Sequence, residues 1–78
     1  MITIQLFGIT KDIIGASVLQ VDMDGNSVFE LRSHLSKSYP KLDKLNSLMV
    51  AVNSEYAADS LILKTEDEVV LIPPVSGG

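Results

Sequence analysis

The segment of the chain best suited to take part in chemistry is its last six residues, Pro73-Pro74-Val75-Ser76-Gly77-Gly78. Two prolines lack backbone donors and favour extended conformations, so a preceding strand should stop there. Fully extended, six residues reach about 20 Å at roughly 3.3 Å each. We therefore predict a flexible, extended tail over residues 73–78 that carries the carboxylate of Gly78 away from the domain. The alternative is an ordinary flexible terminus without a role.

Elsewhere the residue types and spacings do not predict a catalytic or metal centre. The sequence has no cysteine, which excludes disulfides and thiol chemistry. His34 has no second ligand at metal-binding spacing, and the serines have no base that spacing identifies. Residues 22–26 superficially look like a calcium loop, but Gly25 comes too early and Ser33 stands where a glutamate should close the loop. We expect no metal site and no catalytic centre inside the domain.

Composition narrows the class of protein. The chain has 78 residues, 46% of them hydrophobic, and a formal net charge of -4. This length predicts a single domain. The few basic residues are scattered, so nucleic acid is not an expected partner. No apolar run approaches the ~18 residues of a membrane span, and the start lacks the pattern of a secretory signal. We expect a soluble, cytoplasmic protein without a membrane partner.

Hydrophobic periodicity predicts the elements of the first half. Ile2, Ile4 and Leu6 alternate with other residues, which predicts a strand whose next residue, Phe7, points away from the core. A short helical turn or loop follows over 11–15 and ends at Gly15. A second strand is expected over 18–23. The capping-box residues Ser27 and Glu30 then begin a helix with a stripe formed by Val28, Leu31 and Leu35.

The second half predicts two further strands. Pro40 should end the helix, and 41–47 should form a polar connection. Residues 48–52 form an apolar run typical of a strand buried on both faces, and Asn53-Ser54 supply a turn. Residues 61–63 fit a short edge strand or an irregular connection, residues 65–68 an acidic turn, and residues 69–72 the last strand.

This order predicts an α+β fold in which a sheet packs on one main helix. The domain is expected to cover 1–72 and the tail 73–78. Strand, strand, helix, strand, strand is the order of the β-grasp fold, in which the sheet is mixed, although other small α+β folds share it. The tail decides between them.

Residues 67–78 closely resemble the C-terminus of the small subunits of molybdopterin synthase, the sulfur carriers of the ubiquitin-like β-grasp family. Val50-Ala51-Val52-Asn53 and the segment 7–15 are similar to further parts of that family, so the resemblance spans nearly the whole chain. One difference is that Lys11-Asp12 stands where many relatives carry Arg-Glu. The charges are kept, but the guanidinium fork is lost.

The resemblance implies a mechanism. An E1-like activating enzyme uses ATP to adenylate the carboxylate of Gly78, and a sulfur donor protein converts it to a thiocarboxylate. Two such carriers then deliver two sulfurs to a cyclic pyranopterin monophosphate in the pocket of the large subunit. Gly77 and residues 73–76 would thread the tail into its partners, because glycines pass where a Cβ would collide. The carrier itself would bind no permanent cofactor and would be the non-catalytic subunit.

The resemblance also implies a partner surface formed by Phe7, Tyr56 and Ile72, with the alternative that Tyr56 and Ile72 simply pack under the tail. Two other functions fit a diglycine terminus. One is the sulfur carrier of thiamine synthesis, although Pro73-Pro74-Val75-Ser76 favours the molybdenum pathway. The other is a ubiquitin-like modifier or binding module.

Overall fold

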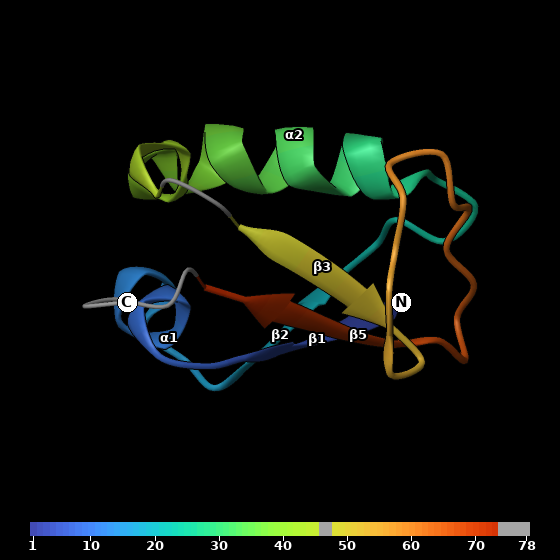
Figure 1. Cartoon of the computed structure of the whole chain (residues 1–78), viewed down its shortest axis with the longest axis horizontal. Coiled ribbons are helices and arrows are strands. Elements are labelled where there is room, and N and C mark those ends of the chain that lie inside the picture. The colour runs from blue at the N-terminus through green and yellow to red at the C-terminus, as the bar shows by residue number, and fades with distance from the viewer. Residues whose placement is uncertain (46–47, 74–78) are drawn as a thin grey trace.

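The computed structural model describes residues 1–45 and 48–73, which fold into strands and helices around one mixed sheet (Figure 1). Within these residues the sheet has five strands in the order β2-β1-β5-β3-β4. The elements, in chain order, are β1 (Ile2–Leu6), α1 (Ile9–Ile14), β2 (Val18–Val21), α2 (Val28–Ser38), the 3-10 helix η1 (Pro40–Lys44), β3 (Met49–Val52), β4 (Glu55–Tyr56) and β5 (Glu68–Ile72).

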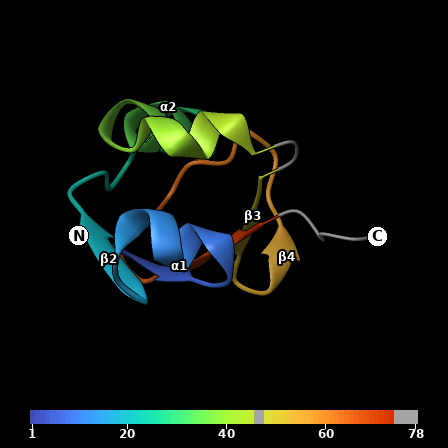
Figure 2. The same cartoon turned by 90° about the vertical axis from the view of Figure 1, so that its left-hand side faces the viewer.

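The first and last strands lie side by side at the centre of the sheet. β1 and β5 run parallel, with Ile4 opposite Val69 and Leu6 opposite Leu71. β2 pairs antiparallel with β1, and β3 antiparallel with β5. α2 lies across one face of the sheet, and α1 lies at the end where β1 and β5 finish (Figures 1 and 2). This is the β-grasp arrangement, so the predicted fold class is confirmed.

The core fills the space between the sheet and α2. Alternate residues of β1 and β5 point inward and are buried, and so is the predicted apolar stripe of α2. The side chains that are at most 1% exposed include Ile2, Ile4, Leu6, Val28, Leu31, Leu35, Val69 and Leu71. Truncating one of these leucines or isoleucines to alanine typically costs about 2–5 kcal/mol of stability. The predicted strand faces and helix stripe are therefore confirmed.

Several predicted boundaries differ from the structure. α1 begins at Ile9 rather than Lys11, although Gly15 ends it in a left-handed conformation as expected. β2 stops at Val21, and η1 occupies the region expected to be a polar connection. In β3, Val50, Ala51 and Val52 are buried, but Met49, which shares the outer face of the sheet with Ile72, is 41% exposed, so the prediction that the whole run is buried was wrong. Residues 61–63 form an irregular connection with a single bridge, between Ser27 and Ile62.

Side-chain hydrogen bonds to the backbone stabilise the start of α2 and the turn before β5. Ser27 accepts from the Glu30 amide at 3.1 Å and Glu30 accepts from the Ser27 amide at 2.9 Å, which confirms the capping box. The hydrogen bond from the Ser27 amide, helped by Asn26, lowers the pKa of Glu30. Asp67 accepts from the Lys64 amide at 2.8 Å and from Asn53 at 2.9 Å. These two bonds lower the pKa of Asp67 in the same way.

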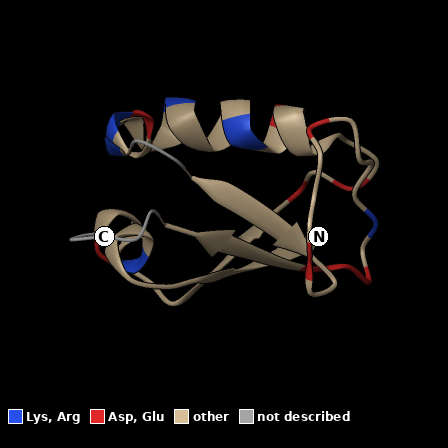
Figure 3. Ribbon diagram, viewed as in Figure 1, with Lys and Arg blue, Asp and Glu red and all other residues tan. Residues whose placement is uncertain are grey.

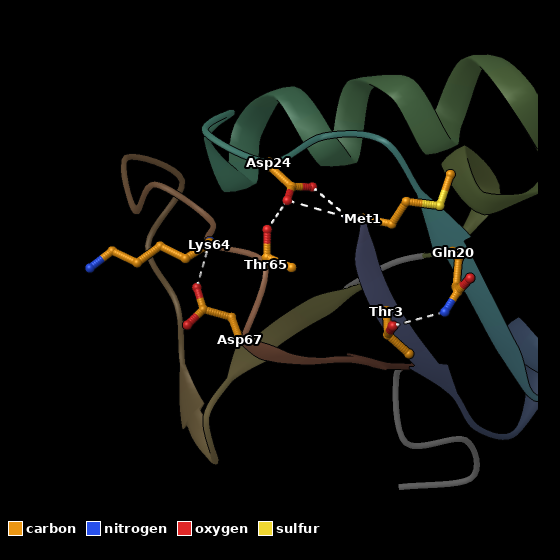
Figure 4. A network of polar contacts seen from close by, with 7 residues as sticks. All are labelled: Met1, Thr3, Gln20, Asp24, Lys64, Thr65 and Asp67. Atoms are coloured by element: carbon orange, nitrogen blue, oxygen red, sulfur yellow. Dashed lines mark hydrogen bonds and ion pairs between the residues drawn. The ribbon is translucent and has the colours of Figure 1, made fainter.

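A polar network joins the start of the chain to the loop before β5 (Figure 4). The α-amine of Met1 lies 3.2 Å from the Asp24 carboxylate, which also accepts from the Thr65 hydroxyl. Gln20 on β2 donates to Thr3 on β1 at 3.3 Å. The acidic turn predicted over 65–68 thus bonds to the β2–α2 connection through Thr65 and to the β3–β4 turn through Asp67.

A glycine turn connects β1 to α1 and touches the start of the tail. Gly8 has φ 57° and ψ -134°, a combination that residues with a Cβ rarely adopt. A Cβ added to Gly8 would lie 3.2 Å from Cγ of Pro73. Thr10 is fully buried; its hydroxyl donates to the Phe7 carbonyl at 2.6 Å and accepts from the Phe7 amide at 3.2 Å. The turn therefore holds Phe7 and Pro73 in fixed places.

The lowered pKa values of Glu30 and Asp67 predict acid sensitivity. Their ordinary values are 4.5 and 3.8, and the folded values are lower, so the unfolded chain takes up protons first as the pH falls. The free energy of unfolding should be unaffected by these two groups above about pH 5 and should fall progressively below it. Thermal melts from pH 6 to pH 2 should show Asp67→Asn with a flatter profile than the parent protein. An acid profile of Asp67→Asn identical to that of the parent would show that this carboxylate does not contribute to the acid sensitivity.

Gly8→Ala should destabilise the domain by about 1–3 kcal/mol, because it places a side chain in a strained backbone conformation and against Pro73. Gly15→Ala and Gly25→Ala are matched controls, since both glycines have positive φ but a Cβ there meets no atom within 4 Å. Denaturant titrations of the three variants should rank Gly8→Ala as the most destabilised. Equal decreases in the free energy of unfolding would show that the contact with Pro73 does not contribute to the destabilisation.

Candidate functional site

The tail begins at the end of a central strand. β5 ends at Ile72, and Pro73 lies against the Gly8 turn that follows the neighbouring strand β1. The remaining tail residues predicted to act, Pro74, Val75, Ser76, Gly77 and Gly78, lie outside the described residues. The division into a 1–72 domain and a 73–78 tail therefore stays a prediction, although the strand stops where the diproline predicts.

The sheet face opposite α2 forms an apolar surface beside this exit. No helix of the described chain covers that face (Figure 2). Strand pairing aligns its residues in rows: Val70 lies between Gln5 and Ala51, Ala51 pairs with Tyr56, and Ile72 pairs with Met49. We call the apolar members of this face the outer patch, which consists of Phe7, Met49, Ala51, Tyr56, Val70 and Ile72.

All three residues predicted for the partner surface lie on this face. Phe7 is 54% exposed and Tyr56 is 69% exposed, while Ile72 is half-buried. Tyr56 and Ile72 line one shallow hollow together with Ala51, Ser54 and Val70. Phe7 directly follows β1, which pairs with β5 so that Leu6 lies opposite Leu71, and its backbone therefore lies next to the end of β5 that carries Ile72. The structure thus brings Tyr56 and Ile72 together and places Phe7 at the end of the strand beside Ile72.

Sequence reasoning missed half of the outer patch. Val70 shares its parity with Ile72, and Met49 and Ala51 share theirs within β3, so strand alternation could have found them once the register was known. The apolar run of β3 concealed this, because both faces of it are hydrophobic. Thr10, which clamps the backbone of Phe7, carried no signal that separates it from a surface threonine.

Among residues 1–45 and 48–73, His, Cys, Asp and Glu side chains form no group of three or more that could hold a metal ion. His34, the single histidine of the sequence, is exposed on α2. None of the helices described here has the length and apolar character that crossing a membrane requires. The features that distinguish this end of the molecule are therefore the outer patch and the start of the tail.

Known proteins match the chain along almost its full length. The chain is 34% identical over 79 residues to the molybdopterin synthase sulfur carrier subunit of Arabidopsis thaliana, covering 99% of this chain and 82% of that protein. It is 35% identical to the subunit of the same name from Dictyostelium discoideum, covering 96% and 93%. The crystal structure of SAMP1 from Haloferax volcanii, a small archaeal modifier protein, superposes with a TM-score of 0.81 at 28% identity, covering 99% and 98%.

The family assignment rests on both the sequence and the fold. The model of the ThiS family matches residues 4–78, which include the whole of β5 and the diglycine end. The resemblance to sulfur carrier subunits seen in the sequence is confirmed by these relatives. The chain belongs to the ThiS family.

Proposed function

We propose that this protein is the sulfur carrier subunit of a molybdopterin synthase. The observation that carries the proposal is the sequence after β5, which ends in Gly77-Gly78 and follows a strand that ends beside the outer patch. Full-length similarity to two proteins with this name supports it. The domain provides a binding face and the tail provides the reacting group, so the chain needs no catalytic centre of its own.

The proposed loading chemistry has two steps. In the first, the Gly78 carboxylate attacks the α-phosphate of ATP on an activating enzyme, which forms an acyl-adenylate and releases pyrophosphate. In the second, a hydrosulfide equivalent from a sulfur donor attacks the acyl carbon and releases AMP, which leaves a thiocarboxylate. Activation is required because a free carboxylate has no adequate leaving group, whereas AMP leaves readily.

The proposed delivery step takes place on the large subunit. The thiocarboxylate sulfur attacks an oxygen-bearing carbon of cyclic pyranopterin monophosphate and displaces the oxygen from it, so that a C–S bond forms as a C–O bond breaks. Water then hydrolyses the acyl–sulfur bond. The carboxylate is regenerated and the sulfur stays on the pterin, so a second loaded carrier completes the dithiolene. A tail of about 20 Å when extended, at roughly 3.3 Å per residue, would reach an internal active site while the domain stays on the surface.

Sulfur loading should require the diglycine end. Incubated with ATP, its activating enzyme and a sulfur donor, the parent protein should gain the mass of one oxygen-to-sulfur exchange in intact mass spectrometry. Gly77→Val should not, because a β-branched side chain restricts the backbone and obstructs a channel that fits glycine. Deletion of Gly78 should also abolish sulfur transfer to the pterin.

Both tail variants should melt at the parent temperature, since terminal residues contribute little to stability. A large fall in melting temperature would mean that the tail is part of the fold. An unchanged parent mass in the presence of active enzymes would refute the carrier function.

The outer patch predicts the contact with the large subunit. Phe7→Ala should weaken that association by about 2 kcal/mol, roughly thirtyfold, because an exposed aromatic residue beside the tail is a typical interface anchor. Phe29→Ala is the matched control, because Phe29 is 58% exposed but lies on α2, behind the sheet. Calorimetric titration measures both affinities. The same affinity for both variants would remove Phe7 from the interface.

The pathway can be separated from that of thiamine synthesis by complementation. Expression in two bacterial strains, one lacking its molybdopterin synthase small subunit and one lacking its thiamine sulfur carrier, gives a direct comparison. The proposal is supported if molybdenum-enzyme activity is restored in the first strain while the second strain still cannot grow without added thiamine. The reverse result would assign the chain to the thiamine pathway.

A modifier function is the second candidate, and the likeness to SAMP1 favours it. In that case the Gly78 carboxylate forms an isopeptide bond to a lysine of another protein. The last basic residue of the chain is Lys64, so trypsin would leave residues 65–78 as a branch on each modified lysine. Finding such branched peptides on several proteins would support conjugation.

A further inference from the structure

Most lysines of this chain lie at one end of the molecule, and most acidic residues lie at the other end (Figure 3). The separation follows from the sheet. Because β1 and β5 are parallel, both end where the tail begins, and the connections 7–17 and 39–45 lie at that end. The connections 22–27 and 53–67 lie at the far end, which holds the starts of β1 and β5. Because different connections form the two ends of the molecule, the net charge of one end can differ from that of the other.

The end that carries the tail is basic. Lys37 lies in the last turn of α2, and Lys41 and Lys44 lie on η1; all three are exposed. We call these three lysines the basic rim. Lys11 on α1 adds a fourth positive charge, and the acidic residues of this end are Asp12 and Asp43. The tail end is thus net positive although the chain has a formal net charge of -4.

The far end holds every other acidic residue of the sequence. Its basic side chain is Lys64, and Arg32 in the middle of α2 pairs with Asp59 at 3.3 Å. The far-end acidic residues are Asp22, Asp24, Glu30, Glu55, Asp59, Glu66, Asp67 and Glu68.

The basic rim lies at the same end of the molecule as the start of the tail. α1 packs against η1, and the turn that begins α1 holds Gly8 against Pro73. The molecule measures 34 Å along its longest axis. At physiological salt the Debye length is about 8 Å, so a partner docked at one end is screened from the charges at the other. A partner that receives the tail therefore meets the local positive charge rather than the net negative charge.

We propose that the basic rim docks on an acidic protein surface around the opening through which the activating enzyme receives the tail. This inference rests on the proposed sulfur-carrier function and adds the charge of the partner surface. Charge alone would point to the opposite conclusion, since a chain with net charge -4 suits a basic partner. Complementary charge acts mainly on the association rate, and it loses effect as salt rises.

The test compares two reversals that change the net charge equally. Lys41→Glu alters the basic rim, and Lys64→Glu alters an exposed lysine at the far end. Association of each full-length variant with the cognate activating enzyme is measured by stopped flow from 20 mM to 500 mM salt. Lys41→Glu should associate about three- to tenfold more slowly at low salt. Lys64→Glu should stay within about twofold of the parent, whose rate should fall as salt rises.

Other outcomes overturn the inference. Equal slowing by both reversals would show that net charge decides the encounter, and a parent rate that rises with salt would show a basic partner surface. Binding of a DNA duplex that Lys41→Glu abolishes would mark the rim as a phosphate-binding surface instead. If the parent is loaded with sulfur but Lys41→Glu associates normally, docking through the basic rim is refuted and the carrier function stands. If the parent neither binds the activating enzyme nor is loaded with sulfur, both the docking proposal and the carrier function are refuted.

Discussion

The parallel pairing of β1 with β5 is the constraint on which the rest of the structure depends. It places the first and last strands of the domain side by side, with Thr3 opposite Glu68 and Leu6 opposite Leu71. The chain therefore leaves the sheet next to the turn that follows β1. A parallel pair needs a long crossover, and here the crossover contains α2, which covers the inner face. The core, the outer face and the tail's position all follow from this one pairing.

The two faces of the sheet differ in what covers them. The inner face is closed by α2 and holds the residues that make the domain stable. The outer face has no such cover among the described residues, yet its tail-side rows are apolar, from Ile72 and Met49 to Val70 and Ala51. A protein gains little by exposing Phe7 and Tyr56 to water unless another surface covers them. This asymmetry supports the proposal that a second protein covers the outer face.

Much of this could be predicted from the sequence, for identifiable reasons. Alternation in 2–7, the capping box at Ser27 and the stripe from Val28 to Leu35 are local patterns, so they gave correct elements and a correct core. Strand register is not local, so Met49 and Val70 were not recognised as neighbours of Ile72. η1 was missed because Pro40 was interpreted as a helix terminator, although proline is also favoured in the first turn of a new helix.

The charge distribution shows a further limit of reasoning from composition. A net charge sums over the whole chain, but a docking partner is sensitive to a few residues within a Debye length. Only the topology reveals that the connections carrying Lys41 and Lys44 lie at the same end as Pro73, whereas Glu66 and Asp67 lie at the other. The sequence contains these residues in plain view, but their grouping depends on which strand ends meet. The fold thus gives an acidic protein a net positive charge at the end where the tail begins.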